Sequence, residues 1–457
     1  MFYSQLGYLL VTVFLLYKLI KKDYNLFQVL IFVLPFHSWI YNIGLNLTIF
    51  QIITFVVLLS AAIKGRNILY VGNITIGLFF LFAIIDTIII SVFFIDEYQN
   101  LGGFFRSEGR YLAQMVLLSI TFAIIPLAFN YIKKMEDVQK YLSVYLSALI
   151  LLALLGWIQY FTYSISGIDL FPLSINQFGD VRSGLYNFEG SKIFRMSSLG
   201  GEPKGFSMSL ILGFFIIHIF NRQGISIFKY DVPLKYLFLF TAFSTLSTSG
   251  MVLFSILFFV NIIYQTVKSK KDIKINSKSM LYGIVIFLII VFLFIRYWDF
   301  VSLIVEQRVF ERDVTSEDYD APIQIFLSKF PEYLLFGSGL GNIHNLAYPY
   351  IPRQYLHYMG DSIFLAKSGY LRITSELGLI GLSLFVFMIY NTYRKLGTLS
   401  MYLNYEDRQF LYAMQLLLVL TLMAYFARTY LSGELFLFLA MANVIVYSKV
   451  IRQKVSR

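Results

Sequence analysis

Long apolar runs recur along the whole 457-residue chain and limit what it can fold into. A run of about 18 or more apolar residues is long enough to cross the hydrocarbon core of a bilayer as a helix. The composition agrees, because 58% of the residues are hydrophobic and only 14% are charged. The sequence therefore predicts an all-α, polytopic integral membrane protein that forms one transmembrane domain over residues 1–457.

The apolar runs predict about thirteen membrane-spanning helices, most of them joined by short connections. Their expected ranges are 3–17, 25–40, 45–63, 74–95, 110–130, 141–163, 205–220, 234–247, 250–266, 279–296, 371–391, 408–427 and 431–448. The stretch STLSTSG, residues 244–250, joins the eighth and ninth ranges. Because the eighth range is short, a re-entrant pair is the alternative there.

Loop charge predicts the orientation of these helices. Most lysines lie in the loops that follow the odd-numbered spans, and basic loops stay on the cytoplasmic side. We therefore expect the N-terminus outside, the C-terminus in the cytoplasm, and two large periplasmic loops at residues 164–204 and 297–370. The net charge of +11 then mostly reflects cytoplasmic lysines, so no nucleic-acid partner is expected. The absence of cysteine excludes disulfides, thiol catalysis and cysteine-bound metals.

The type of basic residue differs between the two predicted faces. The expected outer side holds ten arginines and four lysines, whereas the inner side holds six arginines and seventeen lysines. Arginine grips phosphate oxygens in two places, so the outer set indicates a bound polyanion. Any single arginine could instead brace a loop by pairing with a carboxylate. The ten are Arg106, Arg110, Arg182, Arg195, Arg296, Arg308, Arg312, Arg353, Arg372 and Arg428.

The stretch RMSSLGGEPKGF, residues 195–206, brings charge to the edge of an apolar run. Proline fits the first turn of a helix, so the seventh span is expected to begin at Glu202 or Pro203. A helix start at the outer surface presents free N–H groups and a positive dipole end, with Arg195 and Lys204 close by. This predicts a phosphate site. The alternative is that Glu202 only favours the first turn and Lys204 reaches to the lipid headgroups.

Two glycine-containing stretches follow, FPEYLLFGSGLGN at 330–342 and KSGYLRITSELGLIGLSLFVF at 367–387. The first is superficially similar to a nucleotide loop but lacks the strand and helix that such a loop needs. In the second, Gly378 and Gly381 are expected to allow close helix packing. Arg372 and Glu376 are spaced for a salt bridge along one helix face.

Together, the order of these motifs resembles the O-antigen polymerase and ligase superfamily over roughly residues 140–390. The matching elements are an arginine before GEPK, arginines in a second outer loop, LFGSGLGN, and the helix YLRITSELGLIGL. The resemblance implies a GT-C-like glycosyltransferase architecture in the bacterial inner membrane. Ligases of the superfamily have a histidine where this chain has Lys367, so the resemblance favours a Wzy-type O-antigen polymerase.

The reaction implied by the resemblance is polymerisation of lipid-linked oligosaccharide units during lipopolysaccharide biosynthesis. The growing glycan would leave undecaprenyl pyrophosphate and join a sugar hydroxyl of another undecaprenyl-pyrophosphate-linked unit at the outer face of the inner membrane. No metal, nucleotide sugar or other cofactor is expected, and the partners would be membrane lipid and a chain-length regulator. The alternatives are an O-antigen ligase that transfers glycan to lipid A core, a lipid-linked sugar flippase, and a passive scaffold.

Candidate site residues follow from charge and from the resemblance. Arg195 is the first choice for pyrophosphate and Arg308 and Arg312 are the second, because arginines can stabilise the leaving group without metal. A general base could be Glu202, Asp361 or His357. Further candidates for substrate binding are Arg182, Lys204, Lys367, Tyr370 and Arg372.

Two further acidic features invite a functional interpretation. Asp318 and Asp320 have the spacing of a metal-binding pair, but the surrounding loop lacks an ordered ligand series, so a solvated loop is favoured. Asp86 lies within a predicted span, where a carboxylate is functional by default. Its alternative is a buried pair with an outer-half arginine such as Arg110.

Overall fold

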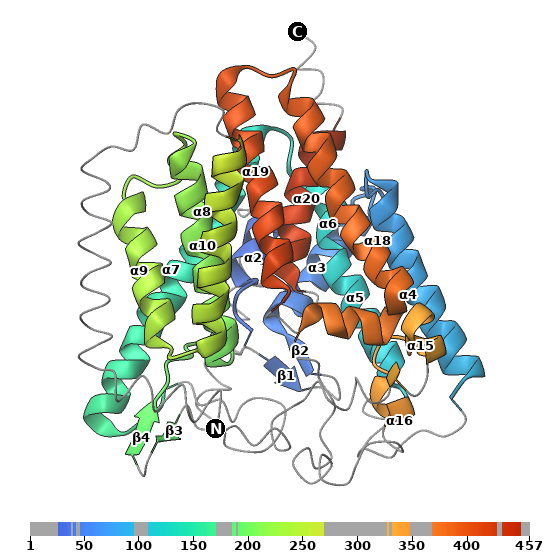
Figure 1. Cartoon of the computed structure of the whole chain (residues 1–457), viewed down its shortest axis with the longest axis horizontal. Coiled ribbons are helices and arrows are strands. Elements are labelled where there is room, and N and C mark those ends of the chain that lie inside the picture. The colour runs from blue at the N-terminus through green and yellow to red at the C-terminus, as the bar shows by residue number, and fades with distance from the viewer. Residues whose placement is uncertain are drawn as a thin grey trace.

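The computed structural model describes residues 26–37, 40–42, 46–95, 108–170, 185–188, 191–268, 327–328, 331–347, 368–426 and 432–448. Over these ranges the chain is a helical bundle with two short antiparallel hairpins (Figure 1). In this part of the chain, five helices are long and apolar enough to cross a membrane, at 74–93, 110–131, 135–166, 203–222 and 369–400. The fold is consistent with an all-α membrane protein. The predicted spans 3–17 and 279–296 lie outside the described residues.

The described helices and strands have the following bounds. The N-terminal helices are α2 (Leu26–Val33), α3 (Ile49–Ile63), α4 (Ile74–Phe93), α5 (Arg110–Phe122), α6 (Ile124–Tyr131) and α7 (Met135–Ser166). The later helices are α8 (Pro203–Arg222), α9 (Asp231–Ser244), α10 (Thr248–Lys268), α15 (Pro331–Phe336), α16 (Ile343–Ala347), α18 (Gly369–Ser400), α19 (Tyr405–Ala424) and α20 (Gly433–Tyr447). Strand β1 (Ile40–Asn42) pairs with β2 (Asn46–Thr48), and β3 (Leu185–Phe188) pairs with β4 (Ser191–Phe194).

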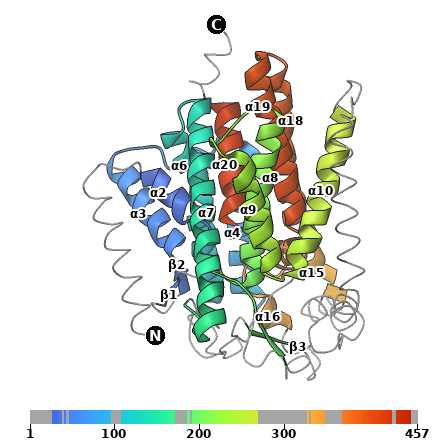
Figure 2. The same cartoon turned by 90° about the vertical axis from the view of Figure 1, so that its left-hand side faces the viewer.

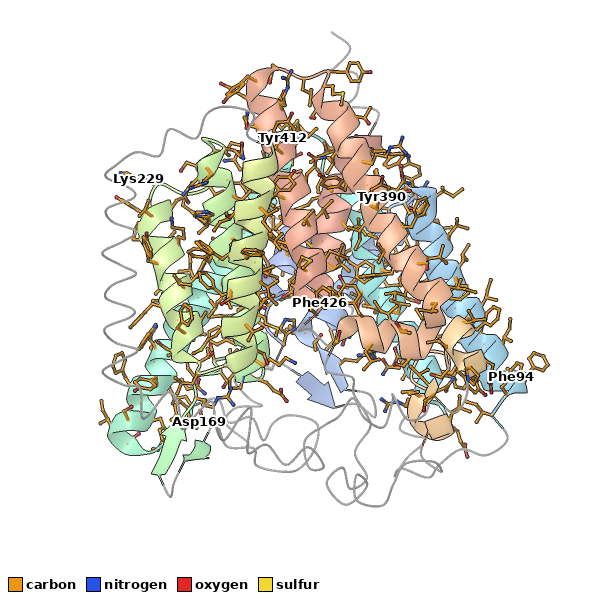
Figure 3. The ribbon with its side chains drawn as sticks, viewed as in Figure 1. Phe94, Asp169, Lys229, Tyr390, Tyr412 and Phe426 are labelled. Carbon is orange, nitrogen blue, oxygen red and sulfur yellow. The ribbon has the colours of Figure 1, made fainter. Side chains whose placement is uncertain are left out.

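Both hairpins lie at one end of the bundle, together with the first residues of α8 and α18 (Figure 1). We call this the hairpin end. Asp169 and Phe94 also lie there, whereas Lys229 and Tyr412 lie toward the opposite end (Figure 3). Helix α7 runs along the bundle between α2 and α3 on one side and α8, α9 and α10 on the other (Figure 2).

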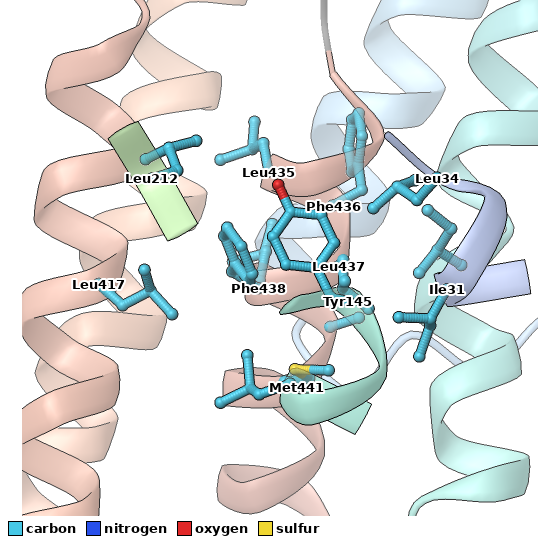
Figure 4. Close-up of a cluster of buried hydrophobic side chains, with 14 of the residues drawn as sticks. Ile31, Leu34, Tyr145, Leu212, Leu417, Leu435, Phe436, Leu437, Phe438 and Met441 are labelled. Carbon is cyan, nitrogen blue, oxygen red and sulfur yellow. The ribbon is translucent and has the colours of Figure 1, made fainter. Parts of the chain in front are cut away.

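Helix α20 forms the centre of the bundle. Every residue from Gly433 to Val446 is buried, and a helix that is apolar on all sides is stable only when protein surrounds it. Side chains from α2, α7, α8 and α19 pack around it. Those labelled in Figure 4 are Ile31, Leu34, Tyr145, Leu212 and Leu417, against Leu435, Phe436, Leu437, Phe438 and Met441 of α20.

Helix α4 shows the opposite pattern, with one buried face and one exposed face. Ile76, Phe79 and Ala83 are buried on the side that packs against α18, where Phe79 meets Phe385 with ring centroids 5.8 Å apart. Leu81 and Ile85 are more than half exposed on the other side. An apolar face of this kind suits contact with lipid.

The structure corrects the predicted span 25–40. Helix α2 ends at Val33, and residues 40–42 form strand β1 instead of more helix. Pro35 explains the early end, because proline lacks an N–H and the residue before it disfavours helical geometry. With only eight residues, α2 is too short to span a bilayer alone.

The predicted span 371–391 also needs correction. Helix α18 extends from Gly369 to Ser400, but Gly378 has the non-helical angles φ 66° and ψ −173°. The helix is therefore two segments, and the part before Gly378 runs in a different direction from the long part after it (Figure 1). The eighth and ninth predicted ranges are two separate helices, α9 and α10, joined by a turn in which Leu246 has a positive φ of 52°.

Candidate functional site

Helix α8 begins at Pro203 with Glu202 as its N-cap, which confirms the predicted start. Proline is suited to this position because its missing N–H would have had no partner within the helix. The side chain of Glu202 makes no capping hydrogen bond and is exposed. The positive end of the α8 dipole, with Lys204 in its first turn, is therefore not neutralised by a cap from Glu202.

Arg195 follows strand β4 and points toward the turn between α9 and α10. Its Nε–H donates to the carbonyl oxygen of Thr245 at 3.3 Å. The first turn of α10, which follows that turn, packs tightly on α8, because a Cβ on Gly250 would lie 2.0 Å from the Ser207 Oγ. The guanidinium of Arg195 is therefore oriented by the backbone at the end of α9.

A buried glutamine on α7 fixes the segment that carries Arg195. The Gln159 Oε1 accepts the backbone N–H groups of Ser197 and Ser198, at 3.2 and 2.7 Å. Its Nε2 donates to the Asp169 Oδ1 at 2.7 Å. Ser198 has a positive φ of 54°, so the turn adopts a conformation that a serine rarely takes without support. Sequence reasoning missed Gln159, although a glutamine within an apolar run was a visible signal.

A second group of polar residues lies at the start of α18. The Arg372 Nε–H donates to the Glu376 Oε2 at 3.2 Å, which confirms the predicted pair. The Arg372 Nη2 donates to the Gln114 Oε1 of α5 at 3.3 Å, and the Gly341 N–H donates to the Glu376 Oε1 at 3.3 Å. Both side chains of the pair are mostly buried. The pair thus joins α5, α18 and the glycine-rich segment, and is more than a surface contact.

The segment GSGLGN, residues 337–342, joins α15 to α16 and packs against α4 and α18. The Ser338 Oγ donates to the Ser375 carbonyl oxygen at 2.8 Å, and the Leu340 N–H donates to the Thr87 Oγ1 of α4 at 2.9 Å. A Cβ on Gly337 would lie 2.4 Å from the Leu377 backbone nitrogen. These contacts favour a structural role for the glycines over nucleotide binding.

The expected close packing at Gly378 and Gly381 is confirmed. A Cβ on Gly378 would lie 2.1 Å from the Leu335 carbonyl oxygen, and a Cβ on Gly381 would lie 3.2 Å from the Phe82 ring. The partner of Gly381 is the spanning helix α4, as a packing glycine predicts. The partner of Gly378 is the short helix α15, which the sequence did not indicate.

Tyr370 contacts the end of α19. Its hydroxyl donates to the Leu422 carbonyl oxygen at 2.6 Å, and the neighbouring Gly369 N–H donates to the Tyr425 carbonyl oxygen at 2.9 Å. The Tyr425 hydroxyl in turn accepts the Ser432 N–H at 2.7 Å, where α20 begins. These bonds join the start of α18 to the start of α20, and they give Tyr370 an anchoring role within the bundle.

The first turn of α20 contains Glu434, which sequence reasoning missed. Its carboxylate is fully buried, and Oε1 accepts from the Ser209 Oγ at 3.1 Å and contacts the His37 Nε2 at 3.4 Å. His37 and Glu434 are 397 positions apart in the chain. The carboxylate thus links α20 to α8 and to the turn after α2.

The helices that carry these groups meet around the start of α20. Ser209 ties α8 to it, and Tyr425 ties α18 to it through Ser432. Phe426, beside the end of α19, lies between the α8–α10 group and the α18 and α4 pair (Figure 3). The basic residues at the starts of α8 and α18 therefore flank one central region at the hairpin end.

Asp86 is buried in α4 and is 7% exposed. Its Oδ2 has no hydrogen-bond partner, and no ion pair joins it to Arg110 within the described part of the chain. The expected alternative, a buried pair with an outer-half arginine, is therefore not formed with Arg110. In the described ranges, no group of three or more His, Cys, Asp or Glu side chains is placed to hold a metal ion.

Six of the predicted site residues cannot be located in the described ranges. Arg182, Arg308, Arg312, His357, Asp361 and Lys367 lie outside them. The predicted metal-spaced pair at Asp318 and Asp320 also lies outside.

Comparison with known families supports the resemblance over the part of the chain that follows α8. A family model described as O-antigen ligase matches residues 234–386, roughly one third of the chain. The matched range contains the α9–α10 turn, the glycine-rich segment and the Arg372–Glu376 pair. No curated protein matches the chain. The family match is consistent with membership of the O-antigen polymerase and ligase superfamily, and it supports an activity of one of these two kinds on lipid-linked glycans.

Proposed function

We propose that this protein polymerises lipid-linked oligosaccharide repeat units. In this reaction the growing glycan leaves undecaprenyl pyrophosphate and joins a sugar hydroxyl of another undecaprenyl-pyrophosphate-linked unit. The observation that carries the proposal is the start of α8, where Lys204 lies in the first turn and the side chain of the N-cap Glu202 makes no capping hydrogen bond, while Arg195 in the segment before α8 bonds the Thr245 carbonyl oxygen. The family match to O-antigen ligases supplies the chemical class of the substrate.

The proposed orientation sets the hairpin end toward the outer face of the bacterial inner membrane. Basic residues at the opposite end support it, because cytoplasmic loops are enriched in lysine and arginine. They include Lys64 after α3, Lys133 and Lys134 before α7, Arg222 at the end of α8, and Arg394 and Lys395 near the end of α18. We also propose a GT-C-like architecture with about thirteen spans. Two large loops, at residues 164–204 and 297–370, would face outward.

Arg195 is the group proposed to bind the pyrophosphate of the donor. As the bond from the anomeric carbon to the pyrophosphate breaks, negative charge grows on the leaving oxygen. A guanidinium can hold two phosphate oxygens, and the α8 dipole and Lys204 add positive potential in the same place. Fixed donors of this kind contribute several kcal/mol, roughly, to stabilising a developing anion. No metal is required by this scheme.

The remaining basic candidates have weaker support. Arg372 already binds Glu376 and Gln114, which favours a structural task at the start of α18. Arg182, Arg308, Arg312 and Lys367 are proposed to complete the pyrophosphate site from the outer loops. Glu202, Asp361 and His357 stay candidates for the base that activates the acceptor hydroxyl, and of these Glu202 lies at the start of α8.

Ligation is the second candidate function, and the description of the matching family favours it. A ligase would transfer the finished glycan to lipid A core. We favour polymerisation because Lys367 occupies the position of the ligase histidine in the resemblance. A lysine with its usual pKa near 10.4 is protonated at neutral pH and cannot accept a proton from a hydroxyl. We also expect that Lys367→His alone will not confer ligation.

The decisive experiment uses purified full-length protein in liposomes with lipid-linked repeat units as the only substrate. A ladder of longer lipid-linked glycans is expected, and it should persist in the presence of a chelator. A second reaction adds lipid A core. Glycan transfer to the core without any ladder would contradict polymerisation and support ligation, and chelator-sensitive synthesis would contradict the metal-free mechanism.

A further inference from the structure

We propose that His37 is the general base of the glycosyl transfer and that Glu434 is its positioning residue. This inference rests on the proposed function, and it assigns a base that the motifs of the chain do not indicate. Glu434 is a buried carboxylate, and His37 is a partly exposed histidine beside it.

The burial of the Glu434 carboxylate needs an explanation, because burying a charge is costly. Its side chain is 0% exposed, in the first turn of the central helix α20. A carboxylate buried without partners costs several kcal/mol, roughly, so it is retained only where hydrogen bonds and charge compensate. Here Ser209 donates to Oε1, and Glu434 lies in the first turn after the N-cap Ser432, where the helix dipole favours negative charge.

His37 connects the buried Glu434 carboxylate to the accessible surface of the protein. It lies in the turn between α2 and strand β1, at the hairpin end of α2. Its side chain is 38% exposed, although its Nε2 is 3.4 Å from the fully buried Glu434 Oε1. A carboxylate accepts hydrogen bonds, so it favours the tautomer with the proton on Nε2. The Nδ1 atom is then the proton acceptor.

A purely structural reading is that the pair only ties the turn after α2 to the centre of the bundle. That role would need one hydrogen bond, which a neutral amide pair could supply without burying a charge. A histidine oriented by a buried carboxylate, with its other ring nitrogen available, is instead the arrangement that general bases use. The carboxylate holds the ring orientation and stabilises the imidazolium that forms.

The position of the pair relative to the proposed pyrophosphate site fits two halves of one reaction. Ser209 and the first residue of α8, Pro203, are six positions apart. With a rise of about 1.5 Å per residue, this corresponds to about 9 Å along the helix axis. The carboxylate that orients the proposed base therefore meets α8 about two helical turns from the proposed leaving-group site.

In the proposed step, the bond to the acceptor oxygen forms as the bond to the pyrophosphate breaks. The acceptor hydroxyl oxygen attacks the anomeric carbon of the donor glycan, and its proton passes to the His37 Nδ1. A new carbon–oxygen bond forms while the bond from the anomeric carbon to the pyrophosphate oxygen breaks, and that electron pair leaves with undecaprenyl pyrophosphate. His37 becomes an imidazolium beside the Glu434 carboxylate, and it then loses its proton to water.

The test compares purified His37→Ala, His37→Gln and Glu434→Gln with the wild type in the liposome assay, after thermal unfolding shows that each variant is folded. We expect His37→Ala to lower kcat by about 100-fold with little change in KM, since a general base contributes about 10²- to 10⁴-fold. Added imidazole should restore at least part of the rate of His37→Ala. It should not rescue His37→Gln, where the amide fills the space.

Glu434→Gln tests the positioning role. We expect its kcat to fall by about 10-fold in the wild-type background and by less than about 2-fold when His37 is already alanine. Loss of equal size in both backgrounds would mean that Glu434 acts on stability alone. His218→Ala is the matched control, because His218 lies toward the opposite end of α8 and stacks on Phe214.

The possible outcomes distinguish failure of the base assignment from failure of the polymerase assignment. If the wild type polymerises and a folded His37→Ala variant is equally fast, or is slow but unresponsive to imidazole, the base assignment is wrong and polymerisation stands. If the wild type ligates instead, polymerisation is wrong and the same variants judge His37 in ligation. If the wild type transfers no glycan at all, both proposals are wrong.

Discussion

The Arg195 Nε–H donates to the Thr245 carbonyl oxygen across fifty positions of sequence, at 3.3 Å. This contact joins the β3–β4 hairpin to the turn between α9 and α10, at the start of α8. It means that the guanidinium is oriented by backbone before any substrate arrives. An oriented guanidinium stabilises a developing charge better than a mobile one, because little rearrangement is needed during the reaction.

Arg195→Ala should abolish long glycans while the protein still inserts and folds. The reason is that the leaving pyrophosphate loses a donor that can bind two oxygens at once. Arg195→Lys should rescue poorly, since an ammonium cannot reproduce the planar fork. Glycan length on gels and single-turnover rates give the measurement. The control is Arg222→Ala, at the other end of α8. Normal glycan length in a normally expressed Arg195→Ala protein would rule out the assigned role.

Gln159→Leu should reduce activity more than stability. The substitution leaves the Ser197 and Ser198 N–H groups without their acceptor, so the turn that carries Arg195 should become mobile. Loss of these buried bonds is expected to cost about 1–3 kcal/mol. The rate should fall by at least about 10-fold, measured beside the thermal unfolding midpoint.

Gln139→Leu is the matched control for that substitution. Gln139 also lies on α7 and donates to a backbone carbonyl, that of Ser226, but its bond is exposed. It should change neither the rate nor the midpoint appreciably. Equal effects of the two substitutions would argue that Gln159 has no special role in holding Arg195.

Gly378→Ala should destabilise the protein strongly. The position needs a positive φ of 66°, and an added Cβ would lie 2.1 Å from the Leu335 carbonyl oxygen. Gly65→Ala isolates the backbone effect, because Gly65 has a φ of 63° and nothing lies within 4 Å of an added Cβ. We expect about 1–2 kcal/mol for Gly65→Ala and at least 2 kcal/mol more for Gly378→Ala. Thermal unfolding in detergent measures both, and similar midpoints would contradict the close approach of α15.

Local rules made some features of the site predictable from the sequence. Pro203 predicted the start of α8 because its ring suits the first turn, whatever surrounds the helix. The spacing of Arg372 and Glu376 predicted their pair, because residues four positions apart lie on one face of a helix. In both cases the determining residues lie within one or two helical turns of each other.

The features that sequence reasoning missed depend on distant contacts. Glu434 contacts His37, which lies 397 positions away in the chain, and no local pattern links the two. The break at Gly378 depends on α15, and the apolar run around it is equally compatible with an unbroken helix. Hydrophobicity alone predicts one span over residues 25–40, whereas Pro35 determines that α2 ends at Val33.

Asp86→Asn should not destabilise the protein, although Asp86 is one of the most buried carboxylates in the described ranges. Its Oδ2 has no partner there, and replacing an uncompensated buried charge by an amide of similar size removes a desolvation cost. Asp137→Asn should do the opposite, because the charge on Asp137 strengthens the bonds that its Oδ2 accepts from the Lys133 and Lys134 N–H groups at 2.8 and 3.1 Å. We expect the thermal midpoint of Asp86→Asn to stay level or rise and that of Asp137→Asn to fall, by about 1 kcal/mol in unfolding free energy. If Asp86→Asn instead lowers the midpoint as much as Asp137→Asn, the carboxylate must have a partner that stabilises its charge. If the midpoint holds but polymerisation fails, Asp86 serves the reaction, as an intramembrane carboxylate often does.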